Sequence, residues 1–356
     1  MQTLPRENQY IMKNIIAAGL VISSLYSCSS TNLVHISVLE PAAVTLPKDV
    51  KTAAILNRSL PGKDNKGLDA MDKLFTLEGV NLDKEGGKAS IEGLTDELVR
   101  NNRFVEVIPV LNSDLGTTGT GQFSGPLAWD IVAKLCKENK ADILFALELF
   151  DTDSKVSYAA NQVSLKTPVG SIPAIEHQAT MQTIVKTRWR IYDPVTKLIL
   201  DEYPISTSLS FYGKGINPAI AAAAIIDRKD AVKQVGTKVG QIYALRIIPT
   251  WFRVTRDYYV KGSENFVVGR RKANTGNWDE AGALWLKDVD HPSEKVAGRA
   301  CYNMAIISEI NGDIDKAIQW AQKSYENYNN KLALRYVNIL KDRRISNDIL
   351  KEQQAE

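Results

Sequence analysis

The chain has 356 residues, of which 44% are hydrophobic and 24% are charged, and its formal net charge is only +3. This composition is typical of a globular protein, and the length is enough for two domains. A net charge this small argues against a nucleic-acid partner, because phosphate binding needs clustered lysines and arginines. The few cysteines and histidines lie far apart and form neither a disulfide framework nor a metal-ligand motif, so we expect no cofactor.

The first feature along the chain is an apolar stretch, from Ile15 to Ser24, that follows Lys13. It is too short for a membrane-spanning helix, which needs about 20 residues, and it has the length of a signal-peptide core. Met12, directly before the lysine, is an alternative start to Met1. The stretch ends in the sequence LYSC, residues 25–28.

LYSC resembles the bacterial lipobox, with a leucine three residues before the cysteine and a small residue directly before it. The resemblance implies that Cys28 is diacylated and becomes the mature N-terminus, after a signal peptide over 1–27 and before a lipid tether over 28–50. Acyl chains anchor a protein stably, since each buried CH₂ contributes about 0.8 kcal/mol. We expect a lipid-anchored envelope protein at the outer membrane, because Ser29 rather than aspartate follows Cys28. The alternative is an ordinary cleaved signal with an incidental cysteine.

Strand and helix patterns then alternate as far as residue 260. Apolar and β-branched runs predict strands over 52–59, 103–111, 141–150, 180–193, 198–211 and 250–260. Amphipathic spacing predicts a helix with Ser90 as its N-cap, a second over 127–139, and a long third that begins at Asn217-Pro218. The third contains Gly236 and Gly240, which we interpret as sites of close helix–sheet packing.

This order predicts an α/β domain over 51–260, a layered sheet with helices and an antiparallel hairpin. The polar segment 151–179 is expected to be an inserted loop or hairpin. The runs AAILNRS, ELVRNNRFVEVI, KADILFALEL and RIYDPVTKLILDE resemble one periplasmic α/β domain. The curli-secretion channel lipoprotein, the lipoprotein activator of penicillin-binding proteins and the N-terminal part of the Tol translocation protein share that domain. The resemblance spans Thr52–Leu245, and Lys197 replaces the usual hairpin glycine.

Residues 261–356 have the pattern of paired helices. Gly276 and Gly312 open the similar runs GNWDEA and GDIDKA, thirty-six positions apart. This spacing resembles the tetratricopeptide repeat, whose period is about 34 residues, and implies an all-α domain that binds protein partners. Asp288 and Ser308 depart from the family pattern, which favours small or apolar residues there. Among the aromatic residues of this domain, we predict that Trp320, Tyr325 and Tyr328 contact the partner.

The most unusual polar residue is Glu148, which lies inside the apolar run FALELF. A buried carboxylate is costly unless it is paired, so we predict an ion pair with Arg188 or Arg190 that sets the sheet register. A role in acid–base catalysis and an exposed edge position are the alternatives. Cys136 and Cys301 lie in helical patterns and are expected to be buried, unpaired thiols.

Two functions follow from these observations. The favoured one is a non-enzymatic, membrane-anchored lipoprotein that acts as an adaptor or assembly factor for an envelope protein. The alternative is an envelope hydrolase or polysaccharide-processing accessory whose carboxylates, Asp151 and Asp153, lie at a strand end. A secretion-pore role is disfavoured, because it needs two long hairpins. Residues 60–88 are too polar for one, and 151–179 contains two prolines.

Overall fold

The computed structural model describes residues 30–59, 72–110, 115, 123–168 and 170–354, and for 72–80 and 167 it describes the backbone alone. The contacts divide the chain into two compact units. The α/β unit comprises Glu40–Thr250 and the residues from Ile349 onward, and the helical unit comprises the residues up to Leu39 and Trp251–Asp348. The predicted fold class, an α/β part followed by an all-α part, is confirmed.

The α/β unit is built on a five-stranded sheet with the order β3-β2-β4-β5-β6. Two strand pairs are parallel, β2 with β3 and β2 with β4, whereas β4, β5 and β6 form an antiparallel meander. The bounds are β2 Thr52–Asn57, β3 Glu106–Val110, β4 Ile143–Thr167, β5 Gly170–Asp193 and β6 Leu198–Gly215. The parallel part is covered on both faces, which explains why its strands are almost continuously apolar.

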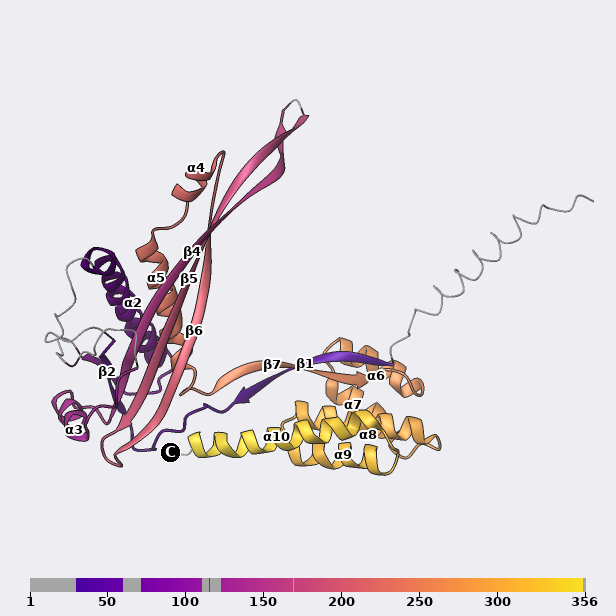
Figure 1. Ribbon diagram of the computed structural model, residues 1–356. Helices are drawn as coiled ribbons and strands as arrows, with labels where there is room; N and C mark the ends of the chain where they lie inside the picture. The colour runs from indigo at the N-terminus through magenta and orange to yellow at the C-terminus, as the bar shows by residue number, and fades with distance from the viewer. Residues whose placement is uncertain (1–29, 60–71, 111–114, 116–122, 169, 355–356) are drawn as a thin grey trace, which may run out of the picture. The chain divides into compact units, whose positions relative to one another are not determined.

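Successive side chains of β2 point to opposite faces of the sheet, and each face is covered by different helices. Ala53 and Ile55 belong to the core beneath helices α2 (Asp72–Arg100) and α5 (Arg228–Ala244). Ala54 and Leu56 belong to a separate core beneath helix α3 (Trp129–Glu138). Side chains two residues apart share a face. The sheet is therefore sandwiched between an α2–α5 layer and α3 (Figure 1).

Helix α2 is longer than the sequence predicted, and it packs closely against α5. It continues through Gly86 and Gly87, so Ser90 is not an N-cap. Ser90 is fully buried in the middle of the helix, and its Oγ donates to the carbonyl of Gly236 at 2.9 Å. A Cβ at Gly240 would overlap the Ser90 carbonyl oxygen. The glycines of α5 therefore permit close helix–helix packing, not the predicted helix–sheet packing.

The third predicted helix is interrupted. Asn217 is the expected N-cap, since its Oδ1 accepts from Ile220 N at 2.9 Å, but α4 ends after one short run, Pro218–Ala223. Helix α5 then starts separately, with Asp227 as its own N-cap.

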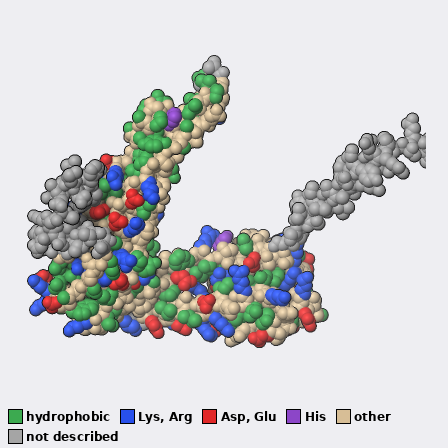
Figure 2. Space-filling model, in the orientation of Figure 1, with side chains coloured by type: hydrophobic (Ala, Val, Ile, Leu, Met, Phe, Trp, Pro, Cys, Tyr) green, Lys and Arg blue, Asp and Glu red, His purple; other side chains and the backbone are tan. Residues whose placement is uncertain are grey.

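The segment 151–179 is regular strand and not an irregular insertion. Strands β4 and β5 pair continuously from Leu144↔Tyr192 to Thr167↔Gly170 with one bulge. Pro173 pairs with Ser164 of β4, but β6 pairs with β5 only from His177 onward, so β5 has one free edge at Pro173, and proline is tolerated at such edges. Apolar side chains stay exposed on this hairpin, at Val156, Tyr158 and Ile175. Figure 2 shows hydrophobic side chains over the hairpin and α4.

The helical unit contains a two-stranded sheet, β1 (Thr31–Glu40) with β7 (Thr250–Tyr259). Part of the predicted tether is therefore a strand, and the predicted last strand of the α/β domain belongs instead with the helices. The helices are α6 Glu264–Asn274, α7 Trp278–Leu286, α8 Glu294–Ile310, α9 Ile314–Glu326 and α10 Lys331–Gln354. No helix within the described ranges is both long and apolar enough to cross a membrane.

Two polar contacts hold these helices to β7 and to one another. The fully buried Asn303 of α8 accepts from Tyr259 N and donates to Tyr259 O, both at 2.7 Å, in place of a neighbouring strand. Asp288, which departs from the repeat pattern, is buried and accepts from Ser263 Oγ and Asn265 Nδ2 at the start of α6. Gly276 and Gly312 have φ values of +82° and +81° and close the helix–helix turns, as their spacing predicted.

The α2–α5 contact gives a first prediction. Alanine is favoured over glycine inside a helix by about 1 kcal/mol, so Gly240→Ala would stabilise an uncrowded helix. Here we expect a net loss of about 2 kcal/mol or more in the free energy of unfolding, because the new methyl meets backbone. Urea denaturation measures this loss. Gly125→Ala is the control, since nothing lies within 4 Å of its added Cβ. Equal stability of the two variants would contradict the close contact.

Candidate functional site

The buried Glu148 is the centre of the most extensive polar network in the described part of the α/β unit. The β4–β5 register shifts between Leu147 and Leu149, so Glu148 occupies a bulge on β4. Its side chain is 0% exposed. A bulge re-aims a side chain and is common beside functional or structural sites. The extra residue here directs a carboxylate to the face that α3 covers.

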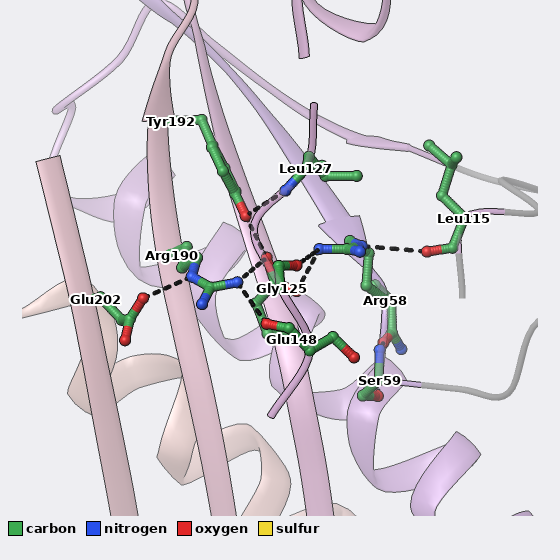
Figure 3. Close-up of polar contacts among 11 residues, drawn as sticks. Arg58, Ser59, Leu115, Gly125, Leu127, Glu148, Arg190, Tyr192 and Glu202 are labelled. Atoms are coloured by element: carbon green, nitrogen blue, oxygen red, sulfur yellow. Dashed lines mark hydrogen bonds and ion pairs between the residues drawn. The ribbon is translucent and has the colours of Figure 1, made fainter. Parts of the chain in front are cut away.

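Two donors bind the two oxygens of this carboxylate (Figure 3). Arg58 Nη1 lies 2.5 Å from Oε2, and the Tyr192 hydroxyl donates to Oε1 at 2.6 Å. Arg58 is 8% exposed and Tyr192 is fully buried. A charge-assisted pair in such surroundings is screened very little by solvent.

The sequence predicted Arg188 or Arg190 as the partner of Glu148. The structure places Arg190 Nη1 3.6 Å from Oε1, while Arg190 Nε donates to Glu202 at 2.7 Å. The guanidinium carbon of Arg188 lies 4.6 Å from the centre of the Phe123 ring, which Arg190 also contacts, at 3.9 Å.

Arg58, which lies closer to Glu148 than Arg190 does, was not predicted from the sequence. It directly follows the strand β2, the parallel neighbour of β4, so a prediction of strand order could have found it.

The same side chains hold the connection between β3 and α3. Arg58 Nε donates to the carbonyl of Leu115 at 3.2 Å, and Arg190 Nη1 donates to that of Ser124 at 2.9 Å. The Tyr192 oxygen accepts from Leu127 N at 3.1 Å. Most of the glycine-rich segment 113–125 lies outside the described residues, but its described parts are tied to the buried network.

Two members of the network, Tyr192 and Arg190, have raised pKa values. Burial, the hydrogen bond to Glu148 and the charge of Glu148 raise the pKa of Tyr192 to about 12. Burial alone would lower the pKa of Arg190, but the hydrogen bonds to Glu202 and Tyr192 and the charge of Glu148 outweigh it and raise that pKa.

Both Glu148 oxygens are occupied and its charge is balanced by arginines. The arrangement therefore suits a structural role and not proton transfer. We call the mutual contacts of Glu148, Arg58 and Tyr192 the structural lock.

Asp151 and Asp153 are not at a strand end. Both lie inside β4, which spans 25 residues from Ile143 to Thr167. Asp151 is 3.8 Å from Lys186, and Asp153 is exposed. Thr152, between them, donates to Asp83 of α2 at 2.8 Å, so alternation turns the two aspartates away from α2. No group of three or more potential metal ligands occurs among the residues that the structure describes.

Asp83 itself has an altered titration. Burial raises the pKa of Asp83 from 3.8 to about 6, and the charge of Asp151 adds to this effect. The hydrogen bond from Thr152 lowers the pKa but does not outweigh them.

The predicted partner-binding residues lie in the helical unit. Trp320, Tyr325 and Tyr328 are each half-buried and pack against its core. Lys323 Nζ lies 5.5 Å from the centre of the Trp320 ring, and the Tyr328 hydroxyl donates to the Val289 carbonyl at 3.1 Å. Cys28 and the predicted signal peptide lie outside the described residues.

The two thiols predicted to be buried and unpaired, Cys136 and Cys301, are confirmed as such. Burial raises the pKa of each to about 11, so neither is a reactive thiolate.

Two family models match parts of this chain. The model described as Domain of unknown function (DUF8603) matches residues 50–259, more than half of the chain. This chain belongs to that family. A second model, Domain of unknown function (DUF6340), matches residues 267–342 in the helical unit. Neither description names a reaction. No curated protein matches the chain.

Two solved structures are similar in part. PelC from Paraburkholderia phytofirmans, solved as a dodecamer, is 9% identical with a TM-score of 0.25, and the match covers 61% of this chain and 99% of that one. A putative neuraminyllactose-binding hemagglutinin homolog from Helicobacter pylori is 11% identical with a TM-score of 0.19, covering 57% and 85%.

The lock predicts a large effect of Glu148→Gln. The variant keeps an acceptor for Tyr192 but leaves Arg58 buried without its counter-charge, and removing one partner of such a pair costs about 3 kcal/mol or more. We expect this loss in the free energy of unfolding. The control is Glu138→Gln, whose side chain is 57% exposed and 3.9 Å from Lys134, with an expected change below about 0.5 kcal/mol. Unchanged melting of Glu148→Gln would refute the lock.

Asp83 predicts a pH-dependent stability. Its raised pKa means that the folded state binds the proton more tightly than the unfolded state, so this stabilisation is complete below about pH 4 and is lost as the pH rises through about 6. Asp83→Asn has no such loss and still accepts from Thr152. We expect the variant to match wild type at acidic pH and to exceed it by about 1 to 2 kcal/mol above neutrality, allowing for partial solvent exposure. A stability difference that does not change with pH in urea titrations would count against the assignment.

Proposed function

We propose that this protein is a membrane-anchored, non-enzymatic lipoprotein that acts as a protein-binding adaptor or assembly factor in the cell envelope. The observation that carries the proposal is the lipobox-like LYSC at residues 25–28, after a short apolar stretch preceded by Lys13. Acylation of Cys28 anchors the chain without a spanning helix, and the outer membrane is the proposed location.

The helical unit supports the partner-binding part of the proposal. Its pairs α6–α7 and α8–α9 meet at glycine turns, as in tetratricopeptide-like repeats, which recognise protein segments. Trp320, Tyr325 and Tyr328 present half-buried aromatic rings, a residue type that often dominates binding energy. The exposed apolar side chains of the β4–β5 hairpin add a surface of the kind that marks protein or membrane contacts.

The α/β unit supports a scaffold role. Its resemblance to the domain of the curli-secretion and penicillin-binding-protein-activator lipoproteins fits an envelope location. Glu148 is occupied in a charge-balanced lock, and Asp151 and Asp153 lie within a strand. These placements favour the adaptor over the hydrolase.

Metabolic labelling with a clickable palmitate analogue tests the anchor. We expect wild type to be labelled and to fractionate with membranes, and Cys28→Ala to be unlabelled and released. Cys136→Ala, which removes a buried thiol, should keep the label and is the matched control.

Envelope cross-linking of the same strains should recover a partner that Cys28→Ala loses. An unlabelled wild-type chain would remove the anchor, and recovery of only the bait and abundant porins would remove the adaptor.

A further inference from the structure

The helical unit contains a polar cavity of about 380 Å³ that has no role in the contacts described above. The first turns of α8 form one wall, through Glu294, Lys295 and Arg299. The turn between α9 and α10 forms the other wall, from Tyr328 to Asn330, and Tyr259 of β7 also lines the cavity. Its size suits a short stretch of peptide or a few side chains, not an extended polymer.

The walls of this cavity are held in place by close packing and by buried or part-buried hydrogen bonds. Gly298 allows α8 to approach Tyr328, since a Cβ there would lie 2.8 Å from the tyrosine Cβ. Ser324 Oγ donates to the Gly298 carbonyl at 2.6 Å and accepts from Asn330 Nδ2 at 3.1 Å. The Tyr259 hydroxyl donates to Asn330 Oδ1 at 3.1 Å. A preformed site loses little conformational entropy on binding.

The charge of the cavity favours an anion. Lys295 and Arg299 are four residues apart on one helix, so their side chains lie on the same face of α8. Arg299 is oriented by its own contacts, because Nη1 donates to the Lys261 carbonyl at 2.6 Å and the guanidinium carbon lies 4.9 Å from the centre of the Tyr259 ring. Glu294 is the one carboxylate among the lining residues, which leaves a net positive wall.

We propose that this cavity binds a carboxylate of an acidic segment of the partner protein, with Lys295 and Arg299 as its ligands and Asn329 and Asn330 at its edge. The inference rests on the proposed adaptor function and names the chemistry of the partner. Tyr328, one of the predicted partner-binding residues, lines the same cavity. Planar carboxylates match the guanidinium fork, and the apolar face of an aromatic ring supports the adjoining chain.

Calorimetric titration of the full-length chain with short peptides tests the site. One peptide alternates serine with glutamate and has an amidated end, a second alternates serine with glutamine and has a free C-terminal carboxylate, and a third is the glutamine peptide with an amidated end. We expect saturable, salt-sensitive binding of at least one carboxylate peptide and none of the third. The first two peptides distinguish side-chain carboxylates from a chain terminus.

Lys295→Glu should weaken this binding at least about tenfold, since it replaces a charge-assisted hydrogen bond by repulsion. Lys295 is exposed, so the variant should fold normally, and Lys341→Glu, at an exposed position of α10 that does not line the cavity, should bind as wild type. The proposal would be overturned if the third peptide bound as tightly as the carboxylate peptides, if Lys295→Glu and Lys341→Glu lost binding equally, or if neither carboxylate peptide bound at up to about 1 mM. It would also be overturned if inorganic phosphate bound and neither carboxylate peptide did. A cross-linked envelope partner that survives Lys295→Glu would exclude this cavity and leave the adaptor function standing.

Discussion

The buried pair of Glu148 and Arg58 is the interaction on which the α/β unit depends. A carboxylate and a guanidinium removed from water are tolerated only when close, well hydrogen-bonded and balanced, and each of these conditions is met. The pair connects two neighbouring parallel strands, one of which continues into the long hairpin with β5. Arg58 and Arg190 also bind the carbonyls of Leu115 and Ser124, so the same charge-balanced group contacts the described parts of the β3–α3 connection.

The helical unit uses the same arrangement with different residues. Arg256 of β7 donates to both oxygens of the buried Glu309 of α8 at 2.9 Å, and the Tyr336 hydroxyl of α10 donates to Glu309 at 2.6 Å. Each unit thus has a buried glutamate held by an arginine and a tyrosine. Such a group is satisfied only in one packing arrangement, so it favours a single relative placement of the elements that supply it.

This rigidity has a consequence for the proposed function. A lipid anchor at Cys28 would place two folded units beside the membrane. Binding of an acidic segment in the cavity between α8 and the α9–α10 turn would then need little rearrangement, because the cavity walls are fixed by contacts of Ser324, Asn330 and Tyr259. The exposed hairpin of β4 and β5 remains available as a separate surface.

Local patterns in the sequence determined the types of the elements that have a clear apolar period, the glycine turns at Gly276 and Gly312 and the need for a partner of Glu148. These features depend on period, backbone freedom and the cost of a buried charge. The LYSC motif, too, is a feature of sequence alone. Only the tertiary structure decided that Arg58 is the closer partner, that Ser90 lies inside a helix packed on α5, and that 151–179 extends the sheet. Each of these outcomes depends on which strands and helices become neighbours in space, and contacts between distant residues leave no local period from which to predict them.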